Sequence, residues 1–158
     1  MKYKNCCITE DLLTLKRYTD WKNTGRITEG EFQIGHPENV ICFRTIGYDA
    51  FSNLSIKEVY LPEGIECIKE YAFKNCWNLV KISLPSTLKS IDYGVFDECY
   101  RLNIIIVNAT TPPKLAENVF KEYNYSNLTI ETPSTSLVDY QNSWGNQYPF
   151  LNIVSQGL

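Results

Sequence analysis

Residues 68–90 read IKEYAFKNCWNLVKISLPSTLKS, and residues 91–108 repeat almost the same pattern as IDYGVFDECYRLNIIIVN. Each copy begins at an isoleucine, reaches a phenylalanine five residues later, passes a cysteine and ends in an apolar alternation. Aligned on the phenylalanine, the copies recur at intervals of 22, 23 and, more loosely, 24 residues, at Phe51, Phe73, Phe96 and Phe120. Self-similarity at a fixed period is the signature of a repeat architecture. The chain is therefore predicted to be an array of stacked copies.

The end of each copy has the pattern of a short β-strand. Apolar residues recur at every second position, at Val59 and Leu61, Ile82 and Leu84, and Ile105 and Val107, and a period of two is that of a strand. A strand of about five residues buries too little surface alone, so the copies are predicted to stack with their strands side by side and parallel. The Ala-Phe segment of each copy is predicted to form a turn, or one helical turn, that points the phenylalanine inward.

The full pattern, IxxxAFxxCxxLxxIxLPxxLxxI, resembles the BspA-like leucine-rich repeat family, and a period near 23 lies within the range of leucine-rich repeats. The resemblance covers roughly residues 40–154 and includes the segment Ala109–Leu115 and the region around Trp144. It implies a right-handed superhelical solenoid of short parallel strands and short helical turns, with terminal helical caps. The predicted domains are an N-terminal flank over residues 1–33, repeats over 34–133 and a C-terminal cap over 134–158.

Each end of the chain contains a predicted helix. The segment 9–21 begins with Thr-Glu-Asp and suits an amphipathic helix of about three turns, which either caps the repeats or binds a partner. Near the C-terminus, Ser134 or Ser136 is the predicted N-cap of a helix over residues 135–144 that covers the last strand. One face of this helix carries Leu137, Tyr140 and Trp144. Gly145 stands where a C-cap glycine belongs.

Composition argues against two classes of partner. The net charge is −3 and the sequence pI is about 5.2, whereas nucleic-acid binding needs a clustered basic surface. No stretch approaches the roughly 18 apolar residues of a membrane span. The first residues, MKYKNCCITEDLL, lack the apolar region of a secretory signal.

Cysteine and histidine patterns predict no metal, no cofactor and no enzyme activity. Six cysteines are present without a CxxC pair, and Cys76 and Cys99 occupy the same repeat position, which favours buried thiols over a disulfide. The single histidine, His36, is predicted to be a solvated loop residue. No nucleotide-binding, hydrolase or metalloprotease motif occurs. The carboxylates Glu63, Glu66, Glu70, Asp97 and Glu98 fall at turns, so a glycan-active enzyme with paired carboxylates is a distant alternative.

Stacked copies place equivalent residues in rows, because neighbouring strands lie about 5 Å apart. One predicted row on the outward face of the strands contains Tyr60, Ser83 and Ile106, and the adjacent row contains Glu58, Lys81 and Ile104. Outward Ile104 and Ile106 beside Tyr60 would form an apolar patch. This patch either marks an interface, which could join two molecules of the protein, or is covered by the C-terminal segment or by a neighbouring repeat.

Aromatic residues form two further predicted rows at the turns. Trp77 and Tyr100 each follow a repeat cysteine directly, and such a pair either binds a sugar face or a protein loop or forms a stack that shields the turn. The other row contains Tyr48 and Tyr93 with Glu70 between them.

These features predict a non-enzymatic module that binds a protein or a glycan of a host or neighbouring cell. The family resemblance implies an adhesin-like protein, exposed at the cell surface or secreted, of a host-associated bacterium. An intracellular structural scaffold in the cytoplasm, or a fragment of a longer repeat array, is the alternative. A fold alone does not establish either role.

Overall fold

The structure is a computed structural model that describes residues 44–120 and 127–157. Its strands form two sheets in which every neighbouring pair is parallel. The larger sheet has the order β2-β4-β6-β8-β9 and is built from β2 (Glu58–Tyr60), β4 (Lys81–Leu84), β6 (Ile104–Val107), β8 (Thr129–Thr132) and β9 (Asn152–Ser155). The smaller sheet has the order β1-β3-β5-β7 and contains β1 (Thr45–Ile46), β3 (Cys67–Ile68), β5 (Ser90–Ile91) and β7 (Lys114–Leu115).

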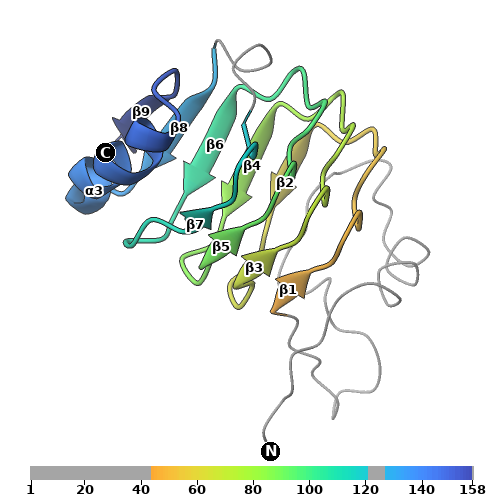
Figure 1. Cartoon of the computed structure of the whole chain (residues 1–158), viewed down its shortest axis with the longest axis horizontal. Coiled ribbons are helices and arrows are strands. Elements are labelled where there is room, and N and C mark those ends of the chain that lie inside the picture. The colour runs from red at the N-terminus through yellow and green to blue at the C-terminus, as the bar shows by residue number, and fades with distance from the viewer. Residues whose placement is uncertain (1–43, 121–126, 158) are drawn as a thin grey trace, which may run out of the picture.

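From β1 to β8 the strands of the two sheets alternate along the chain, so each of these copies of the repeat adds one strand to each sheet (Figure 1). This arrangement is consistent with the predicted solenoid, while its handedness stays a prediction. The predicted strand alternation is confirmed, because Val59, Ile82 and Ile105 are fully buried in register with one another. The second sheet was missed, although Ile46, Ile68 and Ile91, its buried residues, recur at intervals of 22 and 23.

The Ala-Phe segments are turns and not helices, and their hydrogen bonds explain why. Backbone N–H groups alternate between a partner in the same turn and a partner in the next copy. Ala72 donates to the Lys69 carbonyl at 3.2 Å, whereas Phe73 donates to the Val95 carbonyl at 3.0 Å and Asn75 to the Asp97 carbonyl at 2.8 Å. Because alternate N–H groups bond to the neighbouring copy, a continuous i to i−4 helix cannot form.

Two positions in each turn have positive φ, the conformation that normally favours glycine or asparagine. The first position lies two residues before the phenylalanine and is occupied by Asp49, Tyr71, Gly94 and Asn118, with φ between 55° and 61°. The second lies two residues after the phenylalanine and is occupied by Asn53, Asn75 and Glu98. Glutamate is the poorest of these three residues for a left-handed backbone, so Glu98 carries local strain.

We expect Glu98→Asn to raise the free energy of unfolding by about 0.5–1 kcal/mol, because asparagine tolerates positive φ better than glutamate. Asparagine already occupies the equivalent position in the two preceding copies. Urea denaturation measures the change. Glu98→Gln is the matched control, since it removes the charge and keeps the backbone strain. An asparagine variant no more stable than the glutamine variant would contradict this account.

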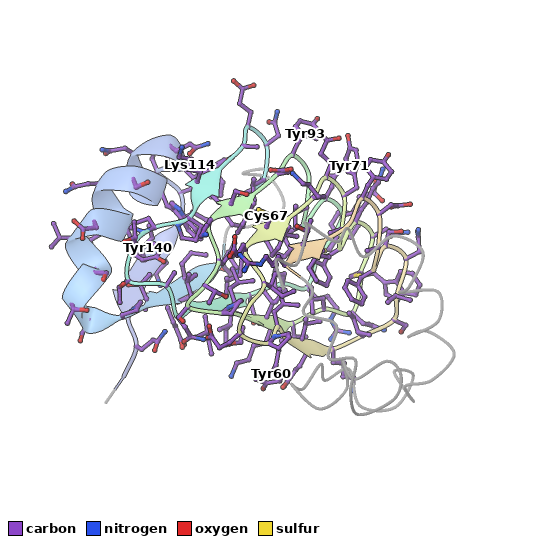
Figure 2. The ribbon with its side chains drawn as sticks, turned by 90° about the horizontal axis from the view of Figure 1, so that it is seen from below. Tyr60, Cys67, Tyr71, Tyr93, Lys114 and Tyr140 are labelled. Carbon is purple, nitrogen blue, oxygen red and sulfur yellow. The ribbon has the colours of Figure 1, made fainter. Side chains whose placement is uncertain are left out.

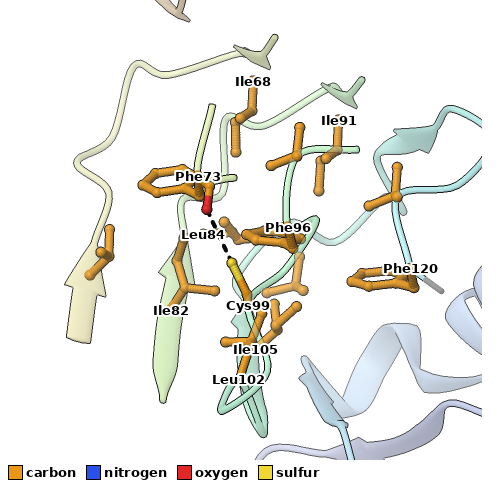
Figure 3. Close-up of a cluster of buried hydrophobic side chains, with 14 of the residues drawn as sticks. Ile68, Phe73, Ile82, Leu84, Ile91, Phe96, Cys99, Leu102, Ile105 and Phe120 are labelled. Atoms are coloured by element: carbon orange, nitrogen blue, oxygen red, sulfur yellow. Dashed lines mark hydrogen bonds between the residues drawn. The ribbon is translucent and has the colours of Figure 1, made fainter. Parts of the chain in front are cut away.

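The core between the sheets is built around a stack of phenylalanine rings (Figure 3). The Phe51 and Phe73 ring centroids lie 5.1 Å apart, those of Phe73 and Phe96 6.1 Å, and those of Phe96 and Phe120 5.9 Å, with nearly parallel planes in each pair. All four side chains are at most 2% exposed. The predicted inward position of the repeat phenylalanine is therefore confirmed.

The C-terminal helical segment covers nearly the predicted residues, but its first and last residues differ from the predicted ones. Ser134–Ser136 form a 3₁₀ turn, Leu137–Tyr140 an α-helical turn (α3), and Gln141–Gly145 a π-helical turn. Pro133, and not Ser134, stands at the N-cap of the 3₁₀ turn, and Ser136, at the N-cap of α3, makes no side-chain capping bond. The C-cap prediction for Gly145 is wrong, since the helical backbone continues into Asn146. Tyr148 N–H still donates to the Trp144 carbonyl at 2.7 Å, so the last turn runs past the glycine.

This helical segment packs on the last copy through hydrogen bonds to backbone carbonyls. Tyr140 Oη donates to the Ala109 carbonyl at 2.8 Å, Trp144 Nε1 to the Pro113 carbonyl at 2.8 Å and Tyr148 Oη to the Ala116 carbonyl at 2.9 Å. Pro113 and Ala116 directly flank β7, which lies at one edge of the smaller sheet, and Ala109 precedes it in the same copy. Buried backbone carbonyls need such partners.

The strand that the C-terminal helix is predicted to cover, β8, is not the last strand of the larger sheet. β9 pairs in parallel with β8, so the helical segment is the connection between two strands of the same sheet. The sequence of β9 does not predict a strand, because only one of its four residues, Ile153, is buried. Several predictions fall on residues outside the described ranges, including the helix over 9–21, the loop at His36 and the flank over 1–33.

Candidate functional site

The outward side of the larger sheet, here called the strand face, contains the two predicted rows in the predicted register. Glu58 is paired with Lys81 and Lys81 with Ile104, while Tyr60 is paired with Ser83 and Ser83 with Ile106. The structure extends the rows by two strands, and the added residues are Thr129, Asn152, Glu131 and Val154. The inward neighbours Ile82, Ile105 and Ile130 are fully buried, so the backbone beneath the rows is held by the core.

The chemistry of the strand face changes from one strand to the next. On β2, Tyr60 Oη donates to Glu58 Oε2 at 2.7 Å, which holds both side chains in place. Ile104 and Ile106 are half-buried on β6. The next strand places Thr129 and Glu131 directly beside them. The predicted apolar patch is therefore one strand wide and has polar neighbours on both sides, Lys81 and Ser83 on one and Thr129 and Glu131 on the other.

Trp77 and Tyr100 lie at the same position of consecutive turns and are exposed, by 44% and 60% respectively. Within the described residues neither ring contacts another aromatic ring, so the stack predicted as an alternative does not form. The residues before them, Cys76 and Cys99, are fully buried. Each exposed ring therefore stands next to an anchored core residue.

A row of three tyrosines lies on another side of the molecule. The Tyr71 ring packs edge-on between Tyr48, at 5.9 Å, and Tyr93, at 5.5 Å. Figure 2 shows Tyr71 and Tyr93 close together and on the opposite side of the ribbon from Tyr60. Glu70 is the residue predicted between Tyr48 and Tyr93, but the Tyr71 ring lies between those two rings. Gly94 makes room for it, because a Cβ there would lie 2.6 Å from Tyr71 Cε1.

The repeat cysteines are free thiols with a structural role. Cys76 Sγ donates to the Phe51 carbonyl at 3.1 Å. Cys99 Sγ donates to the Phe73 carbonyl, also at 3.1 Å (Figure 3). The hydrogen bond of Cys99 with the Cys76 thiol, together with burial, raises the pKa of Cys99 above its ordinary value. Cys67, on β3, is also a free thiol and is partly exposed.

We expect iodoacetamide to modify Cys67 in the native protein while Cys76 and Cys99 stay unmodified, because alkylation needs an accessible thiolate. Peptide mass spectrometry after timed labelling measures each site separately. Labelling in urea is the control and should modify all three. Native-state modification of Cys99 as fast as that of Cys67 would contradict the structure.

Two of the turn carboxylates, Glu63 and Glu66, accept hydrogen bonds from residues of neighbouring turns. Glu66 accepts from Lys89 Nζ at 2.9 Å and from Arg44 Nη1 at 2.7 Å, and these contacts, that of Lys89 first, lower the pKa of Glu66. Burial alone would raise the pKa of Glu63, but hydrogen bonds from Ser86 and Thr87 outweigh it and lower the pKa. A general acid of a glycosidase needs a raised pKa. These two carboxylates therefore lack that property, and the absence of enzyme activity stays a prediction.

Two parallel sheets built from a repeated turn define a repeat protein of the leucine-rich class. The chain matches the BspA type leucine-rich repeat region in six copies over residues 33–144, and it belongs to that family. A search of curated proteins found no match. Proteins of this family are in general repeat modules without catalytic activity. In the part of the chain that the structure describes, no helix is long and apolar enough to cross a membrane.

Proposed function

We propose that this protein is an adhesin-like binding module that presents its strand face to a protein or glycan partner outside the cell. The observation that supports this most is the register of the five parallel strands, which fixes two outward rows of varied side chains over a buried core. Rigid extended surfaces of this kind are what repeat proteins use for recognition. Preorganised side chains also reduce the entropy lost on binding.

The first experiment locates the native protein by protease shaving of intact cells, followed by detection in surface, secreted and cytosolic fractions. Release by protease, or presence in the medium, supports the adhesin-like role. Protection inside the cell would overturn that part of the proposal and favour an intracellular scaffold.

A binding screen then tests the strand face itself. Labelled protein is applied to immobilised extracellular-matrix and serum proteins, and the double variant Lys81→Glu with Ile106→Asp is compared with the wild type. Both substitutions make the strand face more negative, on the neighbouring strands β4 and β6, so we expect at least tenfold weaker binding, which is about 1.4 kcal/mol. Val138→Asp is the matched control, because Val138 is 65% exposed on α3. Equal losses in both variants would contradict a site on the strand face.

A further inference from the structure

We propose that the turn edge around Trp77 and Tyr100 is a glycan-binding site. The two rings would stack on the C–H faces of sugar rings, and polar side chains beside them would bind the hydroxyl groups. This inference rests on the proposed binding role, and it assigns glycans as the ligands of the turn edge around Trp77 and Tyr100. Asn75, Asn78, Glu98 and Arg101 are the polar residues concerned, and each lies within two residues of one of the rings.

The Trp77 and Tyr100 rings are exposed to solvent, and the turns that carry them are held together by backbone hydrogen bonds. Trp77 and Tyr100 are among the most exposed aromatic side chains in the described residues. Tyr48 and Tyr93 are exposed as well, but their rings already pack against Tyr71. The two turns that carry Trp77 and Tyr100 are joined by the Asn75 N–H to Asp97 carbonyl bond of 2.8 Å. The Phe73 and Phe96 ring centroids of the same two turns lie 6.1 Å apart, a spacing that lets one ligand contact both exposed rings.

Polar side chains that are hydrogen-bonded from one turn to the next precede and follow Trp77 and Tyr100 in the chain. On one side, Asn78 Nδ2 donates to Ser55 Oγ at 2.9 Å and Arg101 Nη1 donates to Asn78 Oδ1 at 3.3 Å. On the other side, Asn75 Nδ2 donates to Asn53 Oδ1 at 2.7 Å. An amide carries two N–H donors and a guanidinium five, so these hydrogen bonds orient the side chains and leave further donors for a ligand. Glu98, which occupies the Asn75 position in the next copy, adds an acceptor.

This combination fits a neutral sugar better than a peptide. A sugar ring presents an apolar C–H face and a rim of hydroxyl groups that both donate and accept. Binding sites for such ligands combine aromatic surface with a few polar groups that fix orientation. The single charges of Glu98 and Arg101 offset each other, which disfavours a strongly charged ligand. An apolar peptide would need a larger continuous apolar surface than two rings bordered by polar side chains.

The test applies the labelled full-length chain to an array of neutral oligosaccharides of hexoses and N-acetylhexosamines. The Kd for the strongest binder is then measured by calorimetry. We expect Trp77→Ala and Tyr100→Ala each to raise the Kd at least tenfold, about 1.4 kcal/mol, and Tyr100→Phe, which keeps the ring, to change it much less. Tyr48→Ala is the control at an exposed tyrosine of the tyrosine row, whose ring packs on Tyr71, and it should leave the Kd unchanged. Raising the salt to about 0.5 M should also leave the Kd nearly unchanged, since stacking is not screened.

Absence of binding to the array, or unchanged Kd values in Trp77→Ala and Tyr100→Ala, would overturn the glycan site. These outcomes are distinguishable from failure of the proposed function. If the array shows no binding while a protein ligand is lost by Lys81→Glu with Ile106→Asp and retained by Trp77→Ala, the binding module stands and only the glycan assignment is removed. Absence of both protein and glycan ligands would overturn both proposals.

Discussion

Phe96→Ala is expected to lower the free energy of unfolding by about 3–5 kcal/mol, as measured by urea denaturation. The Phe96 side chain is fully buried. Its ring stacks on Phe73 in the preceding copy and on Phe120 in the following one. Repeat proteins gain much of their stability from contacts between neighbouring copies. Truncation at Phe96 therefore leaves a cavity that weakens two such contacts at once.

Two variants control this prediction. Phe96→Leu keeps most of the volume and loses the stacked ring, so we expect a smaller loss of about 1–1.5 kcal/mol. Tyr100→Ala removes an exposed ring from the same copy and should change stability by no more than about 0.5 kcal/mol. A loss below about 1 kcal/mol in Phe96→Ala would show that the phenylalanine stack is not a main source of stability.

Trp144→Ala is also expected to lower the free energy of unfolding by about 3–5 kcal/mol, because it removes both aromatic packing and a buried hydrogen bond. Trp144 is fully buried and its ring lies 6.3 Å from Phe120 and 5.1 Å from Tyr140. Its indole N–H also donates to the Pro113 carbonyl. The alanine variant loses the packing at the end of the phenylalanine stack and leaves that carbonyl without its donor.

Trp144→Phe separates these two contributions. It keeps an aromatic ring and removes the donor, so a loss of about 1–3 kcal/mol is expected from the unsatisfied carbonyl. Ser143→Ala, one residue earlier and exposed, should be nearly neutral. If Trp144→Ala were as stable as the Ser143 variant, the helical segment would not be needed to stabilise the last copy.

The stability and the proposed function depend on the same repeated hydrogen bonds. Backbone bonds between consecutive turns, such as those from Phe73 and Asn75, hold each copy at a constant offset from the next. That offset places Lys81 beside Ile104 on the strand face, and it places Trp77 and Tyr100 in consecutive turns. Substitutions in the core are therefore expected to weaken binding indirectly. The binding tests above use surface residues for this reason.

The positions of the candidate site residues could be predicted because they follow from register. Once the copies are aligned, equivalent residues must lie in rows, and the structure pairs Glu58 with Lys81 and Tyr60 with Ser83 as expected. The sequence does not decide the exposure of Trp77 and Tyr100, because a stack that shields the turn is also compatible with it. Whether either row binds a partner is a separate matter, which the experiments above address.

The sequence by itself determined the repeat, its family, the inward position of the repeat phenylalanine, the buried thiols and the strand register, because each follows from a periodic pattern of side chains. Only the tertiary structure decided features that depend on contacts between copies or on weak local patterns. The two-residue strands of the smaller sheet are too short to show an alternation. Tyr71 enters the tyrosine row because Gly94 in the next copy leaves space for its ring. Helical structure continues past Gly145, and β9 then adds a strand beside β8, because packing against the last copy outweighs the local preferences of a glycine and a short polar segment.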